Sequence, residues 1–573
     1  MENRRNLSIQ ERTLLEARGC FAEEWDNILV APSFRVEQLR NVRFGGHVSI
    51  GANTFISDAV IRNYDIGQRC TIESVMRLEC RHATTFGEGV RVSVVNENGG
   101  REVIIYRDLT AQAAYLMAMM RHRKAATEAI LSLAEKRAER RGAERGYIGD
   151  DVTIIGAKFL RELYIEDGAT IEGVSQLENG TVGRRATVGV NVCAEEFIFA
   201  EDSKILNGAI VERCYVGANT ILSNGFTAVD SLFFANCHCE NGEAAAVFAG
   251  PYTVSHHKSS LLIAGVFSFF NAGSGTNQSN HLFKSGAVHQ AIHMRGTKFG
   301  SNAYVMAPAI EGPYTVVLGR HTRHHDLQDM PYAYLIEEEG HSSLLPGMAL
   351  TSYGAVRDTE KWKLRDKRTE KRDNICFEEF NPFITGKMLR GVDALIRMRE
   401  NDPEAKTYTY NRTIIKSSML ARGIKLYNSA IGASLGAMLS AGEYNYTATP
   451  CDGEWIDLAG QYVPLCLVDD ILTRAEHGTL TLEEMDAMLS RAMADYNDMA
   501  ATYAYLLLAR LMGHNPSKEE VEETITSARN ILSQMRETTD NDRRRDANED
   551  MWTGYGYDFH TPEAREADFK NTR

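Results

Sequence analysis

A short sequence phrase recurs between residues 148 and 239, and its copies are evenly spaced. An apolar residue opens each copy, Gly, Asp, Asn or Arg commonly follow, a small residue stands four places after the first, and an apolar residue closes the phrase. The six copies are Ile148–Ile154, Ile165–Ile171, Val182–Val188, Phe199–Ile205, Val216–Leu222 and Phe233–Cys239. Six copies at one spacing predict a repeat architecture.

The chemistry of the phrase predicts how one copy folds. The turn-forming residues between two apolar positions indicate a short strand followed by a tight turn. One such unit is too small to bury its apolar side, but stacked units bury these sides in a common column. The distance from one copy to the next holds three such segments, so we expect a triangular solenoid of parallel strands. Two further copies, Ile50–Ile56 and Ile66–Ile72, indicate that the solenoid starts earlier.

This pattern resembles the hexapeptide-repeat transferase superfamily, over roughly residues 42–106 and 147–350. The resemblance implies a left-handed parallel β-helix, and the handedness is taken from the resemblance alone. Within the superfamily, the chain resembles an uncharacterised bacterial family of long hexapeptide-repeat proteins with helical inserts. That likeness includes the segments Gly19–Trp25 and Asn41–Gly46. This likeness implies the domain organisation of the chain but no particular chemistry.

The remaining segments are predicted to be helical additions to a mainly β solenoid. Ser8 and Glu11 form a capping-box pattern at the start of a helix, and residues 108–141 are rich in strong helix formers without a glycine. We expect five parts: an N-terminal helical cap (1–40), a first part of the β-helix (41–106), a helical insertion (107–146), a second part of the β-helix (147–350), and a helical C-terminal domain with a tail (351–573). In the last part, helices are predicted at 385–400, 409–440, 464–476, 481–512 and 517–537.

Composition limits the cellular location and the kinds of binding partner that we expect for this protein. The net charge of −14 argues against nucleic acid or an anionic membrane as a partner, because both attract basic surfaces. The sequence contains no long apolar run and no apolar stretch after Met1, so we expect neither a membrane span nor a signal peptide. Ten scattered cysteines indicate free thiols and a cytoplasmic location.

The densest group of polar residues lies between residues 250 and 302, where five of the 16 histidines fall within 256–293. Hexapeptide acyltransferases resemble this region in placing histidines, with Asn and Gly nearby, a few coils before the end of the solenoid. The resemblance implies transfer of an acyl group from acetyl-CoA, or another acyl-CoA, with a histidine as general base. The predicted catalytic residues are His256, His257, Asn271 and His281.

Other residues of the same region are predicted to hold the cofactor. Backbone N–H groups of the turn containing Gly273 and Gly275 could stabilise an oxyanion. Four basic residues are predicted to contact the phosphates of coenzyme A: Lys258, Lys284, Arg295 and Lys298. The predicted acceptor is a small molecule, a sugar or a sugar nucleotide. The resemblance also implies a homotrimer with sites between neighbouring solenoids.

Two alternatives stay open. The first is a zinc site of the γ-carbonic-anhydrase type, for which His289 with His293, or His321 with His324 and His325, could supply ligands, although neither spacing matches that family. Cys237 and Cys239 are interpreted as structural residues. The second alternative is a binding or assembly scaffold without catalysis. Histidines that converge on one open pocket would favour an enzyme, and histidines scattered over the outside would favour a scaffold.

Overall fold

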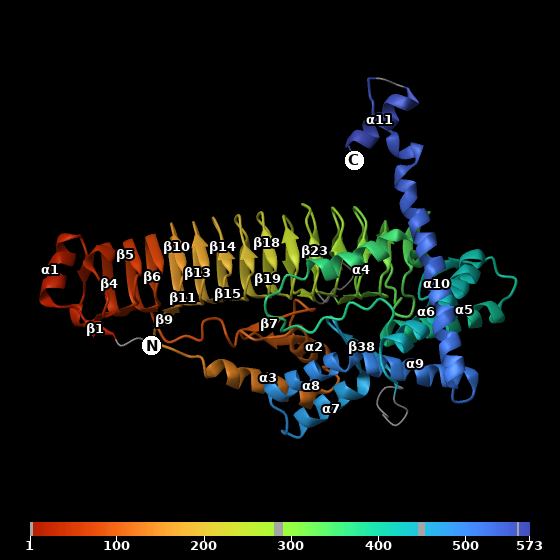
Figure 1. The fold of residues 1–573 in the computed structure, drawn as a ribbon, viewed down its shortest axis with the longest axis horizontal. Helices are drawn as coiled ribbons and strands as arrows, with labels where there is room; N and C mark the ends of the chain where they lie inside the picture. The colour runs from red at the N-terminus through yellow and green to blue at the C-terminus, as the bar shows by residue number, and fades with distance from the viewer. Residues whose placement is uncertain (1–3, 280–289, 445–452, 559–560, 573) are drawn as a thin grey trace.

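The computed structural model describes residues 4–279, 290–444, 453–558 and 561–572. A long solenoid of parallel strands forms the body, and helices lie along one side and at the far end of it (Figure 1). Equivalent positions pair at an offset of one repeat, as Ile154 with Ile171 and Leu160 with Leu177. The predicted parallel β-solenoid with a helical insertion and a helical C-terminal region is therefore confirmed.

The coils stack on three faces. The first face consists of β10 (Thr153–Ile155), β12 (Thr170–Glu172), β14 (Thr187–Val188), β16 (Lys204–Ile205), β18 (Ile221–Ser223), β20 (His238–Glu240), β23 (Val254–Ser255), β26 (Asn271–Ala272), β29 (Lys298–Phe299), β32 (Val316–Leu318) and β34 (Tyr334–Glu338). Five longer strands turn a corner and contribute to both other faces: β11 (Phe159–Ile165), β13 (Gln176–Val182), β15 (Cys193–Phe199), β17 (Ile210–Val216) and β19 (Thr227–Phe233).

Beyond β19 the second and third faces have separate strands. The second face continues in β21 (Glu243–Ala245), β24 (Leu261–Ile263), β27 (Asn277–Ser279), β30 (Tyr304–Met306) and β33 (Arg320–His321). The third face continues in β22 (Phe248–Ala249), β25 (Gly265–Phe267), β28 (Ala291–His293) and β31 (Ala309–Glu311). The chain then reverses into β35 (His341–Leu345), which pairs antiparallel with β34.

The small residue of each phrase points into the solenoid. The side chains at this position are at most 1% exposed, and they belong to Val152, Ala169, Ala186, Ser203, Thr220 and Cys237. Corners between faces place residues such as Asn179 and Asn207 at positive φ, a conformation that asparagine tolerates better than most residues. Core volume and corner geometry therefore explain why the phrase recurs along the chain.

The N-terminal end of the solenoid is closed by a short helix. Helix α1 (Ile9–Ala17) starts at Ser8, and the predicted capping box with Glu11 is confirmed. The strands of this end are β1 (Arg5–Asn6), β2 (Phe21–Ala22), β3 (Ile28–Val30), β4 (Leu39–Ile50), β5 (Phe55–Ile66), β6 (Thr71–Glu79) and β9 (Gly146–Ile148). The chain leaves the solenoid after Glu79, earlier than the boundary expected at residue 106. The reason is that the apolar residues from Val92 to Tyr106 pack with the insertion helices.

The insertion covers part of the third face. It contains a hairpin of β7 (Arg91–Ser93) and β8 (Glu102–Ile104), followed by two helices, α2 (Ala111–Met119) and α3 (Lys124–Glu139). Outward-facing residues of the third face form one apolar core with these helices: Ile198, Tyr215, Leu232, Phe248 and Val266. The insertion therefore forms a layer against the solenoid, and Figure 1 shows it beside the strands.

The C-terminal region is mostly helical, with two hairpins. Its helices are α4 (Tyr353–Arg365), α5 (Pro382–Asn401), α6 (Ser417–Ala441), α7 (Leu465–Glu476), α8 (Leu482–Ala494), α9 (Tyr496–Met512), α10 (Lys518–Arg544) and α11 (Pro562–Thr572). The helix predicted to start at 409 begins only at Ser417, because residues 407–416 form a hairpin of β36 (Thr407–Tyr410) and β37 (Thr413–Lys416). A second hairpin joins β38 (Trp455–Leu458) and β39 (Gln461–Pro464).

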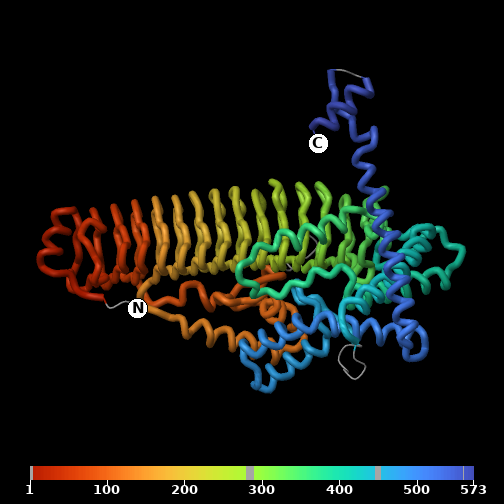
Figure 2. Tube along the Cα trace, viewed as in Figure 1, coloured from red at the N-terminus to blue at the C-terminus, as the bar shows by residue number. Residues whose placement is uncertain are grey.

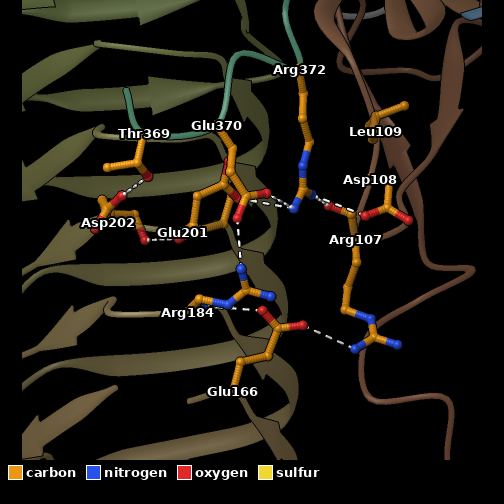
Figure 3. Close-up of polar contacts among 12 residues, drawn as sticks. Arg107, Asp108, Leu109, Glu166, Arg184, Glu201, Asp202, Thr369, Glu370 and Arg372 are labelled. Carbon is orange, nitrogen blue, oxygen red and sulfur yellow. Dashed lines mark hydrogen bonds and ion pairs between the residues drawn. The ribbon is translucent and has the colours of Figure 1, made fainter. Parts of the chain in front are cut away.

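The segment between α4 and α5 ties three parts of the molecule together. Arg372 bonds Asp108 of the insertion at 3.0 Å and Glu370 at 2.9 Å, and Glu370 also pairs with Arg184 of the solenoid at 2.7 Å (Figure 3). The buried Asp373 accepts hydrogen bonds from the backbone of Ala111 and of Ala235. This charged segment therefore fastens the insertion to the solenoid.

The end of the chain extends away from the body. Helix α10 packs against α6 over its first part and then projects beyond the solenoid, carrying α11 with it (Figure 2). Nearly all residues from 541 to 558 are exposed or only half-buried. None of the helices in the described ranges is long and apolar enough to span a bilayer.

Candidate functional site

The coil register brings several predicted site residues onto the first face. Val254 pairs with Asn271, and Asn271 pairs with Lys298, so these positions stack in three successive coils. His256 directly follows β23 on the same side of the solenoid. His281, Lys284 and His289 lie outside the described residues. The structure therefore joins His256, Asn271 and Lys298 into one area.

A second histidine and a carboxylate stand beside His256. Glu240 lies one coil earlier and accepts a hydrogen bond from Nε2 of His238 at 2.9 Å and one from Ser223 Oγ at 3.2 Å. This contact fixes the orientation of the His238 ring. That ring meets the ring of His256 edge-on, with centroids 4.2 Å apart.

His256 has the electrostatic character of a neutral base. Partial burial, and then the neighbouring His238, lower the pKa of His256, with smaller lowering contributions from His257 and Lys361 against an opposing effect of Glu240. Its Nε2 atom is covered and has no hydrogen-bond partner among the described residues. A covered imidazole nitrogen without a partner is unusual, because buried polar atoms are ordinarily hydrogen-bonded.

Helix α4 runs over this area and occupies one of the predicted cofactor contacts. Lys298 forms an ion pair with Asp358 and donates to the carbonyl of Gly354 at 3.2 Å, so its ammonium group holds α4 to the solenoid. Trp362 of α4 packs on Phe269 at the adjacent corner, with centroids 4.7 Å apart. Lys361, on the same helix, adds positive charge near His256.

Arg295 has a structural position and does not face solvent. Arg295 is only 2% exposed. Its guanidinium pairs with Asp457 at 2.9 Å and donates to the carbonyls of Cys376 at 2.6 Å and Gly460 at 2.7 Å. The same group lies over the rings of Phe269 and Tyr462, 4.2 Å from each centroid. These contacts all lie within the protein, so Arg295 joins the solenoid to the β38–β39 hairpin rather than meeting a phosphate.

The other predicted residues have mixed positions. His257 and Lys258 are exposed at the turn after His256. A Cβ at Gly273 would lie 2.5 Å from the carbonyl oxygen of Phe299, and one at Gly275, whose φ is +71°, would lie 2.4 Å from Asn302 Oδ1. The stacking of the next coil therefore accounts for both glycines, and their predicted contact with an oxyanion stays a prediction.

A separate cluster of charged groups lies inside the last coils. Glu311 accepts hydrogen bonds from His293 Nδ1 at 2.5 Å and from His325 Nε2 at 2.7 Å, and all three side chains are at most 1% exposed. Burial alone raises the pKa of Glu311, but the two imidazoles outweigh it and hold the pKa well below its usual range. Glu311 is therefore a buried carboxylate.

Hydrogen-bond partners define the proton positions in this cluster. Gln278 Oε1 accepts from the N–H of Ile263 at 3.2 Å, so the amide nitrogen of Gln278 donates to His293 Nε2 at 2.7 Å. His293 is accordingly neutral and carries its proton on Nδ1. His325 faces an acceptor at each ring nitrogen, namely Glu311 and the carbonyl of Arg323 at 3.2 Å, which requires two protons. Glu311 and His325 therefore form a buried ion pair.

The histidines considered as zinc ligands form hydrogen bonds with other groups of the protein. His321 bonds Ser342 Oγ at 2.8 Å and the carbonyl of Leu318 at 3.2 Å, and burial lowers its pKa to about 4. Within the part of the chain that the structure describes, no three His, Cys, Asp or Glu side chains are arranged to hold a metal ion. Cys237 and Cys239 are fully buried, as their interpretation as structural residues requires.

Sequence reasoning missed His238, Glu240 and Glu311. Coil counting could have found Glu240, because it precedes His256 by one coil. Lys361 could not be found in this way, since it reaches the site from a helix much later in the chain.

Comparison with known proteins places the chain in a family. Residues 53–399, more than half of the chain, match the model described as Domain of unknown function (DUF4954). The chain belongs to the DUF4954 family. The match covers the solenoid from β5 onward, the insertion, helix α4 and most of helix α5, and therefore includes the residues around His256 and Glu311. Residues 443–573, which contain helices α7 to α11, match a second model described as Domain of unknown function (DUF6819).

A relative aligns with about two thirds of the chain. An uncharacterized protein of Treponema pallidum (strain Nichols) is 22% identical to this DUF4954 chain in an alignment 447 positions long that covers 67% of the chain. The alignment spans 60% of the relative's own length. Neither family description nor the relative's name states an activity.

Proposed function

We propose that the protein is an acyltransferase that uses an acyl-CoA, such as acetyl-CoA, with His256 as general base. The observation that carries the proposal is the arrangement of His256, His238 and Glu240 on the first face. Neutral His256 takes the proton of an acceptor hydroxyl or amine while the acceptor oxygen or nitrogen attacks the thioester carbonyl. The bond to sulfur breaks, and the imidazolium returns the proton to the departing thiolate of coenzyme A.

The neighbouring groups have defined parts in this proposal. Glu240 accepts from His238 and thereby positions the ring against which His256 packs. Lys258 and Lys361 supply positive charge for the phosphates of coenzyme A, in place of Arg295 and Lys298, which the protein itself occupies. Nε2 of His256 is covered, so the groups that cover it must move aside when substrate binds. The acceptor is proposed to be small or sugar-like, and the assembly a homotrimer, as the hexapeptide-repeat resemblance implies.

Replacing His256 with glutamine is expected to lower the rate of CoA release at least about 100-fold, the usual contribution of a general base. The assay incubates the protein with acetyl-CoA and a mixture of amino sugars, polyols and amines, and measures free CoA by chromatography. The wild-type rate should rise with pH and level off with an inflection below 6.5, because the pKa of His256 is lowered and only the neutral ring accepts a proton.

His257→Gln is the matched control, since His257 is the adjacent histidine but is exposed. It should keep the wild-type rate within about twofold. Equal activity of the folded His256→Gln variant would remove His256 as the base.

The projecting arm favours an assembly scaffold as the second candidate function. Helix α10 extends well past the body, and α11 lies at its far end (Figure 2). Such an arm offers surface to another molecule without any requirement for catalysis.

A further inference from the structure

We propose that a pocket between the insertion and the last coils binds a small organic anion with an apolar body, and that Arg101 and Arg412 recognise its charge. The pocket has a volume of about 640 Å³, within the range of small-molecule sites. It lies on the third face, whereas His256 lies on the first, so this site does not rest on the proposed acyl transfer.

The apolar part of the pocket continues the surface that the insertion covers elsewhere. Val266 pairs with Ile292, and Ile292 pairs with Ile310, in successive coils of the third face. Val266 belongs to the core shared with the insertion, but Ile292 and Ile310 are only half-buried and form the floor of the pocket. Val95 and Met119 of the insertion line the same pocket. An apolar ligand body would complete this layer.

Arg101 supplies a cation that has no counterion among the described residues. It is half-buried, and its guanidinium donates to the carbonyl of Ala118 at 3.0 Å and to Gln290 Oε1 at 3.0 Å. Both acceptors are neutral, and no carboxylate of the described residues lies within ion-pair distance of Arg101. Residues 280–289 contain neither Asp nor Glu. A guanidinium that is partly removed from water gains most from an anionic acceptor.

The opposite rim is formed by the tip of the β36–β37 hairpin. Arg412 is exposed and donates to the carbonyl of His324 at 3.2 Å, while Asn411 donates to the carbonyl of Asp326 at 2.7 Å. The carboxylate of Asp326 also lines the pocket, but it already accepts from the backbone and side-chain amides of Gln328. His325 also lines the pocket but is already paired with Glu311, so Arg101 and Arg412 against the single carboxylate of Asp326 leave the lining with an excess of positive charge.

The test uses two fluorescent probes that share one aromatic body: 8-anilinonaphthalene-1-sulfonate, an anion, and N-phenyl-1-naphthylamine, its neutral counterpart. Each is titrated into the full-length protein. The wild type should bind the anion at least tenfold more tightly than the neutral probe. Arg101→Gln should weaken binding of the anion about tenfold and leave the neutral probe unchanged, and Arg101→Lys should restore part of the loss.

Arg91→Gln is the control, because Arg91 belongs to the insertion but pairs with Glu135 outside the pocket lining. It should leave both affinities unchanged, as should His256→Gln. The proposal is overturned if Arg101→Gln weakens both probes equally, if it weakens neither, or if the wild type shows no preference for the anion. Unfolding midpoints of all variants verify that the compared proteins are folded.

Discussion

Replacing Arg295 with methionine is expected to destabilise the junction between the solenoid and the C-terminal region by about 3–5 kcal/mol, the usual effect of removing one member of a buried ion pair. The substitution leaves Asp457 as a buried carboxylate without its cation and removes the donor to the carbonyls of Cys376 and Gly460. It also removes the cation between two aromatic rings. Methionine fills much of the volume, so the effect measures charge and hydrogen bonding.

Hydrogen exchange measured by mass spectrometry is the appropriate readout, because it reports stability segment by segment. Amides of β38, β39 and residues near Cys376 should exchange faster in Arg295→Met, while β11 to β17 should keep their wild-type rates. Arg320→Met is the matched control: Arg320 also lies over a ring, 4.5 Å from the centroid of Tyr304, but it is exposed. Wild-type exchange at the hairpin of Arg295→Met would contradict the assigned structural role.

Replacing Glu311 with leucine is expected to destabilise the last coils by about 3–5 kcal/mol, since it leaves the doubly protonated His325 without its buried counterion. The Nδ1–H of His293 loses its acceptor as well. Glu311→Gln should cost far less, about 1–2 kcal/mol, the scale of replacing a charged hydrogen bond by a neutral one. A glutamine oxygen can accept from His293, and its amide can donate to a neutral His325 that keeps its proton on Nδ1.

The two Glu311 variants are compared by urea denaturation followed by circular dichroism, and the control is Glu172→Leu. Glu172 is an exposed glutamate of β12 in the same solenoid. Its replacement should change stability by no more than about 0.5 kcal/mol, as for other surface positions. Equal losses for Glu311→Leu and Glu311→Gln would contradict the protonation states assigned to His293 and His325.

The solenoid was predictable because one physical requirement repeats in every coil. Each coil needs a small inward residue, as at Ala169 and Ala186, and a tolerant residue at its corner, as at Asn179. The insertion was predictable as helical for a local reason, since its residues are strong helix formers. The early exit after Glu79 was not predictable, because Val92 to Tyr106 carry the same apolar pattern whether they pack on coils or on helices.

The candidate site was predictable only in part, and the reason is again physical. Residues one coil apart stack, so the spacing could place Asn271 beside Val254, two residues before His256. Arg295 could not be recognised as a buried residue, since its partner Asp457 lies in a hairpin far along the chain. Arg101 and the floor at Ile292 meet only because the insertion folds back on the third face.

A calorimetric titration of the purified full-length protein with acetyl-CoA tests the central claim most directly. The proposed acyltransferase should bind it with a dissociation constant in the micromolar range, about −8 kcal/mol, and Arg101→Gln should leave this affinity unchanged. Absence of binding at millimolar acetyl-CoA, over several temperatures, would contradict acyl-CoA-dependent transfer. The assembly scaffold, which the projecting arm favours, would then be the function to pursue.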